Sequence, residues 1–216
     1  MNSRFVPRIQ QAVWTAIGLS LLLSLVLSAA PVSAAECEEG LPPIVDGKTL
    51  DGWEGDPRFW SVEDGTITGQ TTEDNPTEHN TFLIWKKGDV DDFVLRFEYR
   101  LIGGNSGVQY RSFQKPDEWE KWVVGGYQAD FEAGDRYSGI LYGERFRGIL
   151  ADRGQKTVIG KDHKPKVVEQ FADSQDLQKY VKKEDWNEYE ISAEGFHFVH
   201  KINGQPLYVW KQKRDK

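Results

Sequence analysis

Cysteine is nearly absent from this chain, since Cys37 is the only one among 216 residues. A single thiol cannot form an internal disulfide, so the hydrophobic core alone must hold the fold together. A reactive or intermolecular role for Cys37 finds no further support in the sequence.

Basic residues are also few relative to acids. Lys and Arg number 27 against 34 Asp and Glu, which gives a net charge of −7, and no long basic cluster occurs. Nucleic-acid-binding proteins concentrate positive charge where phosphates dock. The sequence therefore excludes nucleic acid as an expected partner.

Long apolar runs are missing except at the N-terminus, where Arg4 and Arg8 precede an uncharged stretch from Ala12 to Ala30. Small residues follow, as a signal-peptidase site requires. We interpret residues 1–35 as a signal peptide of a secreted or periplasmic protein, with no membrane attachment after cleavage. The alternative is a retained transmembrane anchor, because a span needs about 20 apolar residues.

The remaining chain, residues 36–216, has a suitable length for one domain and is rich in aromatic residues. The whole sequence contains eight Trp, eight Tyr and eleven Phe. Most should lie in the core, whereas exposed ones on a polar face would stack well on sugar rings.

Apolar and polar residues alternate with period two from Trp60 onward, and no βαβ rhythm appears. Phe93–Leu101 has apolar residues at every odd position, which is typical of a half-buried antiparallel strand. Asp64-Gly65 and Asn203-Gly204 are tight-turn dipeptides between strands. The poorly alternating stretch 143–184 predicts a long excursion, with a helical turn or two around Ser174–Val181.

The first candidate site segment is Gly103–Arg111. Its glycines permit close backbone approach, and Asn105 can both donate and accept hydrogen bonds. Strand alternation predicts that Gln109 and Arg111 share one face and that Val108 lies on the other. The alternative is a glycine-rich hairpin with an edge arginine.

The second candidate segment is Gly125–Glu132. Alternation places Gln128, Asp130 and Glu132 on one face, with about 6.7 Å between successive members. Carboxylates at that spacing suit a glycosidase pair, which needs about 5–5.5 Å for retention and more for inversion. The alternative is an ordinary solvated strand face.

A third segment, Gly139–Gly148, supplies Tyr142, Glu144 and Arg147, which could bind hydroxyls or an oxyanion. Surface ion pairing is the alternative. Asn187 completes the set of candidate substrate-binding residues.

Metal-binding spacing is not found. His197 and His200 are three apart in an expected strand and so face opposite ways, and we expect no metal and no cofactor. Asp89, Asp91 and Asp92 leave calcium as the alternative to a solvated turn. No nucleophile elbow or phosphate loop occurs.

Taken together, an ordered series of short motifs resembles the 3-keto-disaccharide hydrolase domain family. The series spans about residues 43 to 210 and consists of Asp46–Trp53, Trp60–Gly65, Gly103–Arg111, Tyr127–Asp130, Gly139–Tyr142, Trp186-Asn187 and Ile202–Gly204. The resemblance implies an all-β, two-sheet antiparallel jelly roll of the concanavalin-like kind, with the Asn105–Arg111 and Gln128–Glu132 strands lining its ligand face. It also implies a carbohydrate substrate, a glycoside oxidised to a ketone at C3.

A C3 ketone acidifies the C2 hydrogen, so a base can remove it, the enolate can expel the C1 substituent, and water can add back. We assign Asp130 as base, Arg111 and Asn105 to the developing oxyanion, and Glu144 or Tyr142 as proton donor. Gln128 would orient the sugar, while Gln109, Glu132, Arg147 and Asn187 would contact it.

One departure from the family is visible at the C-terminus. Members usually continue past Asn203-Gly204 into a glycine-led strand with a His and then a final strand, which predicts here a sandwich lacking its last strand or strands. Such a sandwich exposes an unpaired edge, unless a neighbouring chain or an N-terminal segment covers it.

Two other functions stay open at this point. One is a non-catalytic carbohydrate-binding module, since one fold supports both. The other is an ordinary glucanase that uses Asp130 and Glu132 as its carboxylate pair. The sequence leaves the oligomeric state open.

Overall fold

A computed structural model describes residues 3–8, 41–160, 162 and 164–212 of the chain. Cys37, His163 and most of the predicted signal peptide lie outside these residues, so the signal peptide and the export that it implies stay predictions. The single described helix, α1 (Ser174–Gln178), is far too short to cross a membrane, and no other membrane-spanning candidate occurs in the described part.

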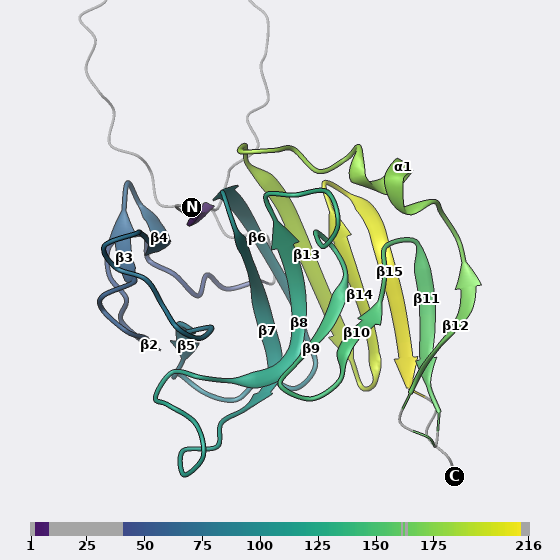
Figure 1. Cartoon of the computed structure of the whole chain (residues 1–216), viewed down its shortest axis with the longest axis horizontal. Coiled ribbons are helices and arrows are strands. Elements are labelled where there is room, and N and C mark those ends of the chain that lie inside the picture. The colour runs from purple at the N-terminus through teal and green to yellow at the C-terminus, as the bar shows by residue number, and fades with distance from the viewer. Residues whose placement is uncertain (1–2, 9–40, 161, 163, 213–216) are drawn as a thin grey trace, which may run out of the picture.

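The described chain forms two main packed layers of β-sheet (Figure 1). The larger sheet has nine strands in the order β12 (Pro165–Gln170), β11 (Gln155–Ile159), β15 (Gln205–Gln212), β14 (His197–Ile202), β13 (Asn187–Glu194), β6 (Phe93–Ile102), β1 (Ser3–Arg8), β4 (Thr66–Thr71) and β3 (Trp60–Glu63). The smaller sheet has the order β10 (Gly148–Ala151), β9 (Leu141–Glu144), β8 (Gly125–Glu132) and β7 (Asn105–Phe113). A short pair, β2 (Trp53–Glu54) with β5 (Ile84–Trp85), completes the strands. The predicted jelly-roll sandwich is confirmed.

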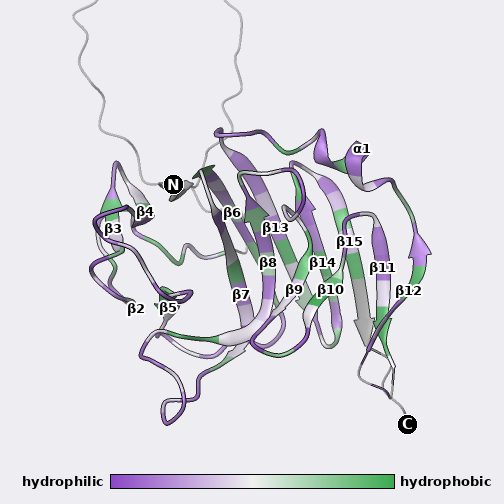
Figure 2. Ribbon diagram, viewed as in Figure 1, coloured by the Kyte–Doolittle hydropathy of each residue, from purple (hydrophilic) through white to green (hydrophobic). Residues whose placement is uncertain are grey.

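The core lies between the two sheets and is built largely from aromatic rings. Tyr99 of β6 stacks on Phe131 of β8 with 4.3 Å between ring centroids. Figure 2 shows that hydrophilic and hydrophobic residues alternate along several strands of both sheets. The two turn dipeptides predicted above, Asp64-Gly65 and Asn203-Gly204, have positive φ angles at both residues, as a type I′ turn requires.

A polar cluster sits inside this core. His200 is fully buried, and its ring nitrogens lie 3.0 to 3.1 Å from the hydroxyls of Tyr110, Tyr189 and Tyr208. Tyr110 belongs to the smaller sheet and the other three residues to the larger one. The cluster therefore joins the two layers by hydrogen bonds inside the largely aromatic core.

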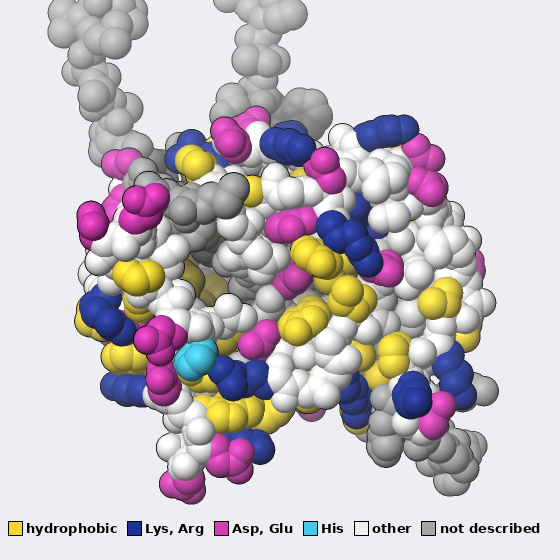
Figure 3. Space-filling view, in the orientation of Figure 1, with side chains coloured by type: hydrophobic (Ala, Val, Ile, Leu, Met, Phe, Trp, Pro, Cys, Tyr) yellow, Lys and Arg dark blue, Asp and Glu magenta, His cyan; other side chains and the backbone are white. Residues whose placement is uncertain are grey.

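One edge of the sandwich is open beside β7. Among the described strands β7 has a neighbour on one side only, and a recess of about 2370 Å³ separates it from the lobe formed by residues 41–92. Figure 3 shows this recess, and its lining includes Phe82, Phe93 and Val108. The expectation that the sandwich lacks its last strand stays a prediction.

A strand from the N-terminus fills a different position in the larger sheet. β1 lies between β6 and β4 and pairs Arg4 with Ile102 on one side and with Gln70 on the other. β1 falls within the predicted signal peptide. In this structure an N-terminal segment thus joins the lobe to the rest of the sheet.

The prediction of a long irregular excursion over 143–184 was wrong in part. The stretch contains β10, β11 and β12, and β11 runs parallel to β15, the one parallel pair among the described strands. Short strands with charged, exposed residues alternate too weakly for the pattern to be recognised. The helical turn near Ser174 is confirmed as α1, capped by Asp173.

Candidate active site

The site residues lie on the face of the smaller sheet that points away from the core. Register pairs Gly107 with Asp130 and Gln109 with Gln128 between β7 and β8, and Gln128 with Tyr142 between β8 and β9. Directly paired residues share a face. Six of the predicted residues are thereby brought together: Asn105, Gln109, Gln128, Asp130, Tyr142 and Glu144.

Gly107 allows the amide side chains to reach the acid. A Cβ on Gly107 would lie 2.7 Å from Cγ of Gln128, so Gln128 lies across the glycine. Nε2 of Gln128 donates to Oδ1 of Asp130, and Nε2 of Gln109 donates to Oε1 of Gln128 at 2.9 Å. Two amides are therefore linked in a chain that ends on the carboxyl group.

Gly107→Val should consequently impair the site and also strain the pairing of β7 with β8, because the added Cβ would displace Gln128 and would lie 2.9 Å from the backbone oxygen of Ala129. Displacement of an orienting group by about 1 Å can cost about a hundredfold in rate. We expect kcat/KM on the substrate proposed below to fall about tenfold to a hundredfold, measured alongside thermal unfolding. Ser106→Ala, on the other face of β7, is the control and should keep kcat/KM; an equal loss in both variants would contradict the prediction.

Asp130 is the most perturbed acid in the site. It is 6% exposed, and this burial raises its pKa to about 7. The nearby charges of Glu132 and Glu144 raise the pKa further, whereas hydrogen bonds from Gln128 and Asn105 lower it. A carboxyl with a pKa near neutrality suits general base catalysis.

Glu144 and Tyr142 stand beside Asp130 on β9. Glu144 is buried opposite Gly126, and its Oε1 accepts a hydrogen bond of 3.4 Å from Nδ2 of Asn80 in the lobe. Burial and the charges of Glu144 and Asp130 raise the pKa of the Tyr142 phenol. Two potential proton donors thus flank one potential base.

Arg111 does not join this cluster, and the predicted facing of Gln109 and Arg111 was wrong. The β7–β8 register shifts between Tyr110 and Phe113, and Arg111 has a φ of 48°. Its guanidinium therefore lies over the Phe198 ring, 5.0 Å from the centroid, and pairs with Asp91 and Asp92. A bulge of this kind reverses the alternation on which the prediction rested.

Arg147 and Asn187 also lie apart from the cluster. Arg147 stacks on Phe146 and interacts with Tyr127, whose ring is on the core side of β8. Asn187 is buried in β13 of the larger sheet, where it bonds the backbone of Lys182 at 2.8 Å. Both residues stabilise turns or edges of the fold.

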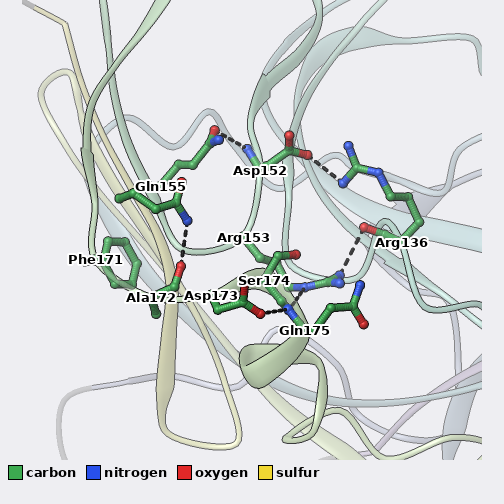
Figure 4. A pocket seen from close by; sticks show the side chains of 10 residues that line it. Arg136, Asp152, Arg153, Gln155, Phe171, Ala172, Asp173, Ser174 and Gln175 are labelled. Atoms are coloured by element: carbon green, nitrogen blue, oxygen red, sulfur yellow. Dashed lines mark hydrogen bonds and ion pairs between the residues drawn. The ribbon is translucent and has the colours of Figure 1, made fainter.

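Glu132 shares the face of Asp130 but is engaged in a turn. Its Oε1 accepts from the backbone nitrogens of Arg136 and Tyr137, the latter at 2.6 Å. Arg153 also holds this turn, because its buried guanidinium donates to the carbonyls of Asp135, Arg136 and Ser138. Figure 4 shows the hydrogen bond to Arg136. This engagement leaves Glu132 poorly placed to act as a nucleophile.

A second pocket lies beside Arg153, but its polar side chains are occupied by contacts within the protein. Figure 4 shows that Arg136 pairs with Asp152, and that Gln155 and Asp173 accept backbone hydrogen bonds. These groups are already satisfied within the protein. Within the part of the chain that the structure describes, no group of three or more His, Cys, Asp or Glu residues could hold a metal ion.

Asn80 belongs to the site in the structure but was not predicted as a site residue from the sequence. It lies in an irregular segment and contacts Glu144 across 64 positions of the chain. Neither periodicity nor a motif marks it, so only the folded chain could identify it.

Comparison with protein families gives one match. The model described as the 3-keto-alpha-glucoside-1,2-lyase-like domain matches residues 40–216. A comparison with curated proteins found no match.

Proposed function

This chain belongs to the 3-keto-alpha-glucoside-1,2-lyase-like domain family, a family of carbohydrate-active hydrolases and lyases, and we propose that it cleaves the glycosidic bond of 3-keto-glycosides. The observation that carries the proposal is a buried carboxyl group, Asp130, with a pKa raised to about 7 among three amide side chains. Such an arrangement suits removal of a proton from carbon next to a ketone.

Asp130 acts in the proposal as the base. Its carboxylate takes the C2 proton, and the electron pair of the C2–H bond forms the C2–C3 double bond of an enolate. Burial makes the carboxylate more basic than an exposed one, because a low-polarity environment disfavours its charge. Because the raised pKa of about 7 lies close to neutrality, the ionised, competent form of Asp130 is available at neutral pH.

Neutral amides replace Arg111 as stabilisers of the enolate oxygen. Asn105, Gln109 and Gln128 carry N–H donors on the face of Asp130, and preorganised donors of this kind stabilise a charge that develops in the transition state. Among the described residues no arginine contributes to the pKa of Asp130, so the effect of burial dominates. An arginine at hydrogen-bond distance would lower the pKa of the base.

The enolate then expels the C1 substituent, and a C1–C2 double bond forms as the C1–O bond breaks. Glu144 or Tyr142 gives a proton to the departing oxygen. Water adds to the resulting enone, with its oxygen at C1 and a proton at C2. The net reaction is hydrolysis without an oxidant or a metal, although the reaction begins as an elimination.

The two competing functions receive less support. A glucanase would need Glu132 as a partner of Asp130, but Glu132 caps the turn at Arg136 and Tyr137. A binding module has no use for a buried acid with a pKa near 7, since an ionisable group in that position costs stability.

The test is an assay on matched 3-keto and unoxidised glucosides, with C2-proton exchange in deuterated water followed by NMR. Exchange and cleavage of the 3-keto compounds alone would support the elimination. Equal cleavage of both kinds would instead favour a glucanase, and binding without exchange or cleavage would leave a binding module.

The pH dependence gives a further prediction. Because Asp130 must be ionised to act as base, kcat/KM for a substrate whose leaving group needs no proton should rise about tenfold per pH unit below its pKa of about 7 and level off above it. Initial rates measured between pH 5 and pH 9 give this rise of kcat/KM with pH. A rate that is flat from pH 5 upward would contradict the assignment.

A further inference from the structure

Asn80 is the residue of the lobe whose side chain reaches the acid cluster. Asn80 is exposed, whereas Glu144 is 9% exposed, so the amide lies between solvent and the carboxyl group. Its Nδ2 donates to Oε1 of Glu144 at 3.4 Å, and no other side-chain hydrogen bond to Glu144 is found in the described part of the chain. Asn80 is thus in a position to orient that carboxyl.

The backbone near Asn80 is anchored on both sides. Two residues later, the Phe82 nitrogen donates to the carbonyl of Trp122 at 2.9 Å, which fixes the segment to the loop before β8. On the preceding side, Oγ1 of Thr77 donates to the His79 carbonyl at 2.6 Å. The position of Asn80 therefore follows from contacts that do not involve the acid itself.

Glu144 is better suited than Tyr142 to protonate a leaving group. The pKa of the Tyr142 phenol is raised above its usual value of 10, so its proton is held tightly at neutral pH. An amide that donates to Oε1 also leaves Oε2 as the oxygen that can carry the proton.

The open recess lies on the same side. Asn80, Gln109 and Gln128 line it together with apolar side chains such as Phe82 and Val108. The recess therefore adjoins the cluster on the side where Asn80 and Gln128 lie.

We propose that Asn80 is a positioning residue, which holds the Glu144 carboxyl so that its Oε2 protonates the oxygen leaving C1. The proposal rests on the function proposed above and adds the identity of the acid and the residue of the lobe that orients it. The proton moves from Oε2 to the departing oxygen as the C1–O bond breaks, and water later restores it.

The test compares two 3-keto-glucosides that differ in the leaving group. A methyl glucoside expels methanol, which needs a proton as it leaves, whereas a 4-nitrophenyl glucoside expels a stable phenolate, which does not. For the full chain carrying Asn80→Ala, cleavage of the methyl compound should fall about tenfold to a hundredfold, while cleavage of the nitrophenyl compound should change less than about twofold. Exchange of the C2 proton of the methyl compound should continue, because Asp130 is untouched. Glu144→Gln should show the same pattern.

Asn75→Ala is the matched control, since Asn75 lies in the same segment and donates to the carbonyl of Arg58 at 2.8 Å. It should leave both substrates unaffected. If Asn80→Ala slowed both substrates equally, or if Tyr142→Phe alone produced the leaving-group dependence, the inference would be overturned. Failure of the proposed function is distinguishable, because the wild-type protein would then show no C2 exchange at all.

Discussion

Asp130→Asn should reduce cleavage of a 3-keto-glucoside by about a thousandfold and should abolish C2-proton exchange. General base catalysis contributes about 10² to 10⁴ in rate, and an amide cannot accept the proton. The amide keeps the size of the carboxyl group and can still accept from Gln128. Single-turnover rates and NMR exchange measure the loss.

The same substitution should stabilise the fold above pH 7. The folded pKa of Asp130 is raised from 3.8 to about 7, so between these values the unfolded chain binds fewer protons than the folded one. Stability therefore falls as pH rises through this window, by up to about 1.4 kcal/mol per unit. Removing the acid should recover about 1 to 3 kcal/mol at pH 8, seen as a higher Tm.

Glu132→Gln is the control for the activity and stability effects of Asp130→Asn, because Glu132 lies two residues from Asp130 on the same face of β8. Its carboxylate caps a turn, so its loss should lower stability while C2 exchange continues. Comparable loss of exchange in both variants would show that the base has been misassigned. A lower Tm for Asp130→Asn at pH 8 would show that the buried carboxyl group does not destabilise the fold.

His200→Leu should destabilise the protein by about 3 kcal/mol, the largest stability effect that we expect from one side chain. The substitution removes the imidazole partner of the Tyr189 hydroxyl and leaves the hydroxyls of Tyr110 and Tyr208 only their mutual hydrogen bond of 3.1 Å. An unsatisfied buried group costs about 1 to 3 kcal/mol. For a domain of this size that corresponds to a Tm lower by about 10 °C. Thermal unfolding by circular dichroism measures it.

His197→Leu provides the comparison within the same strand. His197 is exposed and three residues from His200, so its replacement should change stability by less than about 0.5 kcal/mol. Tyr189→Phe, which removes one hydroxyl and leaves the others paired, should fall between the two. Equal effects of the two histidine substitutions would contradict a role for the core cluster.

The two buried titrating groups also predict an unusual pH dependence. Burial lowers the pKa of His200 well below 6.5. Its contribution to the free energy of unfolding is therefore complete above pH 6.5 and is lost as the pH falls below that value, by up to about 1.4 kcal/mol per pH unit. The contribution of Asp130 has the opposite slope between about pH 4 and 7. The two contributions to the free energy of unfolding therefore oppose each other below pH 6.5, and each should appear separately in the variant that keeps only one of the two groups.

Much of the site could be predicted because strands β7 and β8 obey strict alternation where they carry chemistry. The facing of Gln128 and Asp130 follows from a period of two, and so does that of Gln109. Arg111 could not be predicted, because a one-residue shift in register after Tyr110 reverses every later position. Arg147 was misplaced for a similar reason, since the turn after Glu144 takes a positive φ at Arg145.

Local patterns therefore determined the class of fold, the turns and the row of polar residues around Asp130, because alternation and turn chemistry depend on neighbours in the chain. Three features depended on the tertiary structure alone. They are the raised pKa of Asp130, the engagement of Glu132 in a turn, and the contact between Asn80 and Glu144. Each arises from burial or from contacts that only the folded chain creates, and no periodicity records such contacts in the sequence.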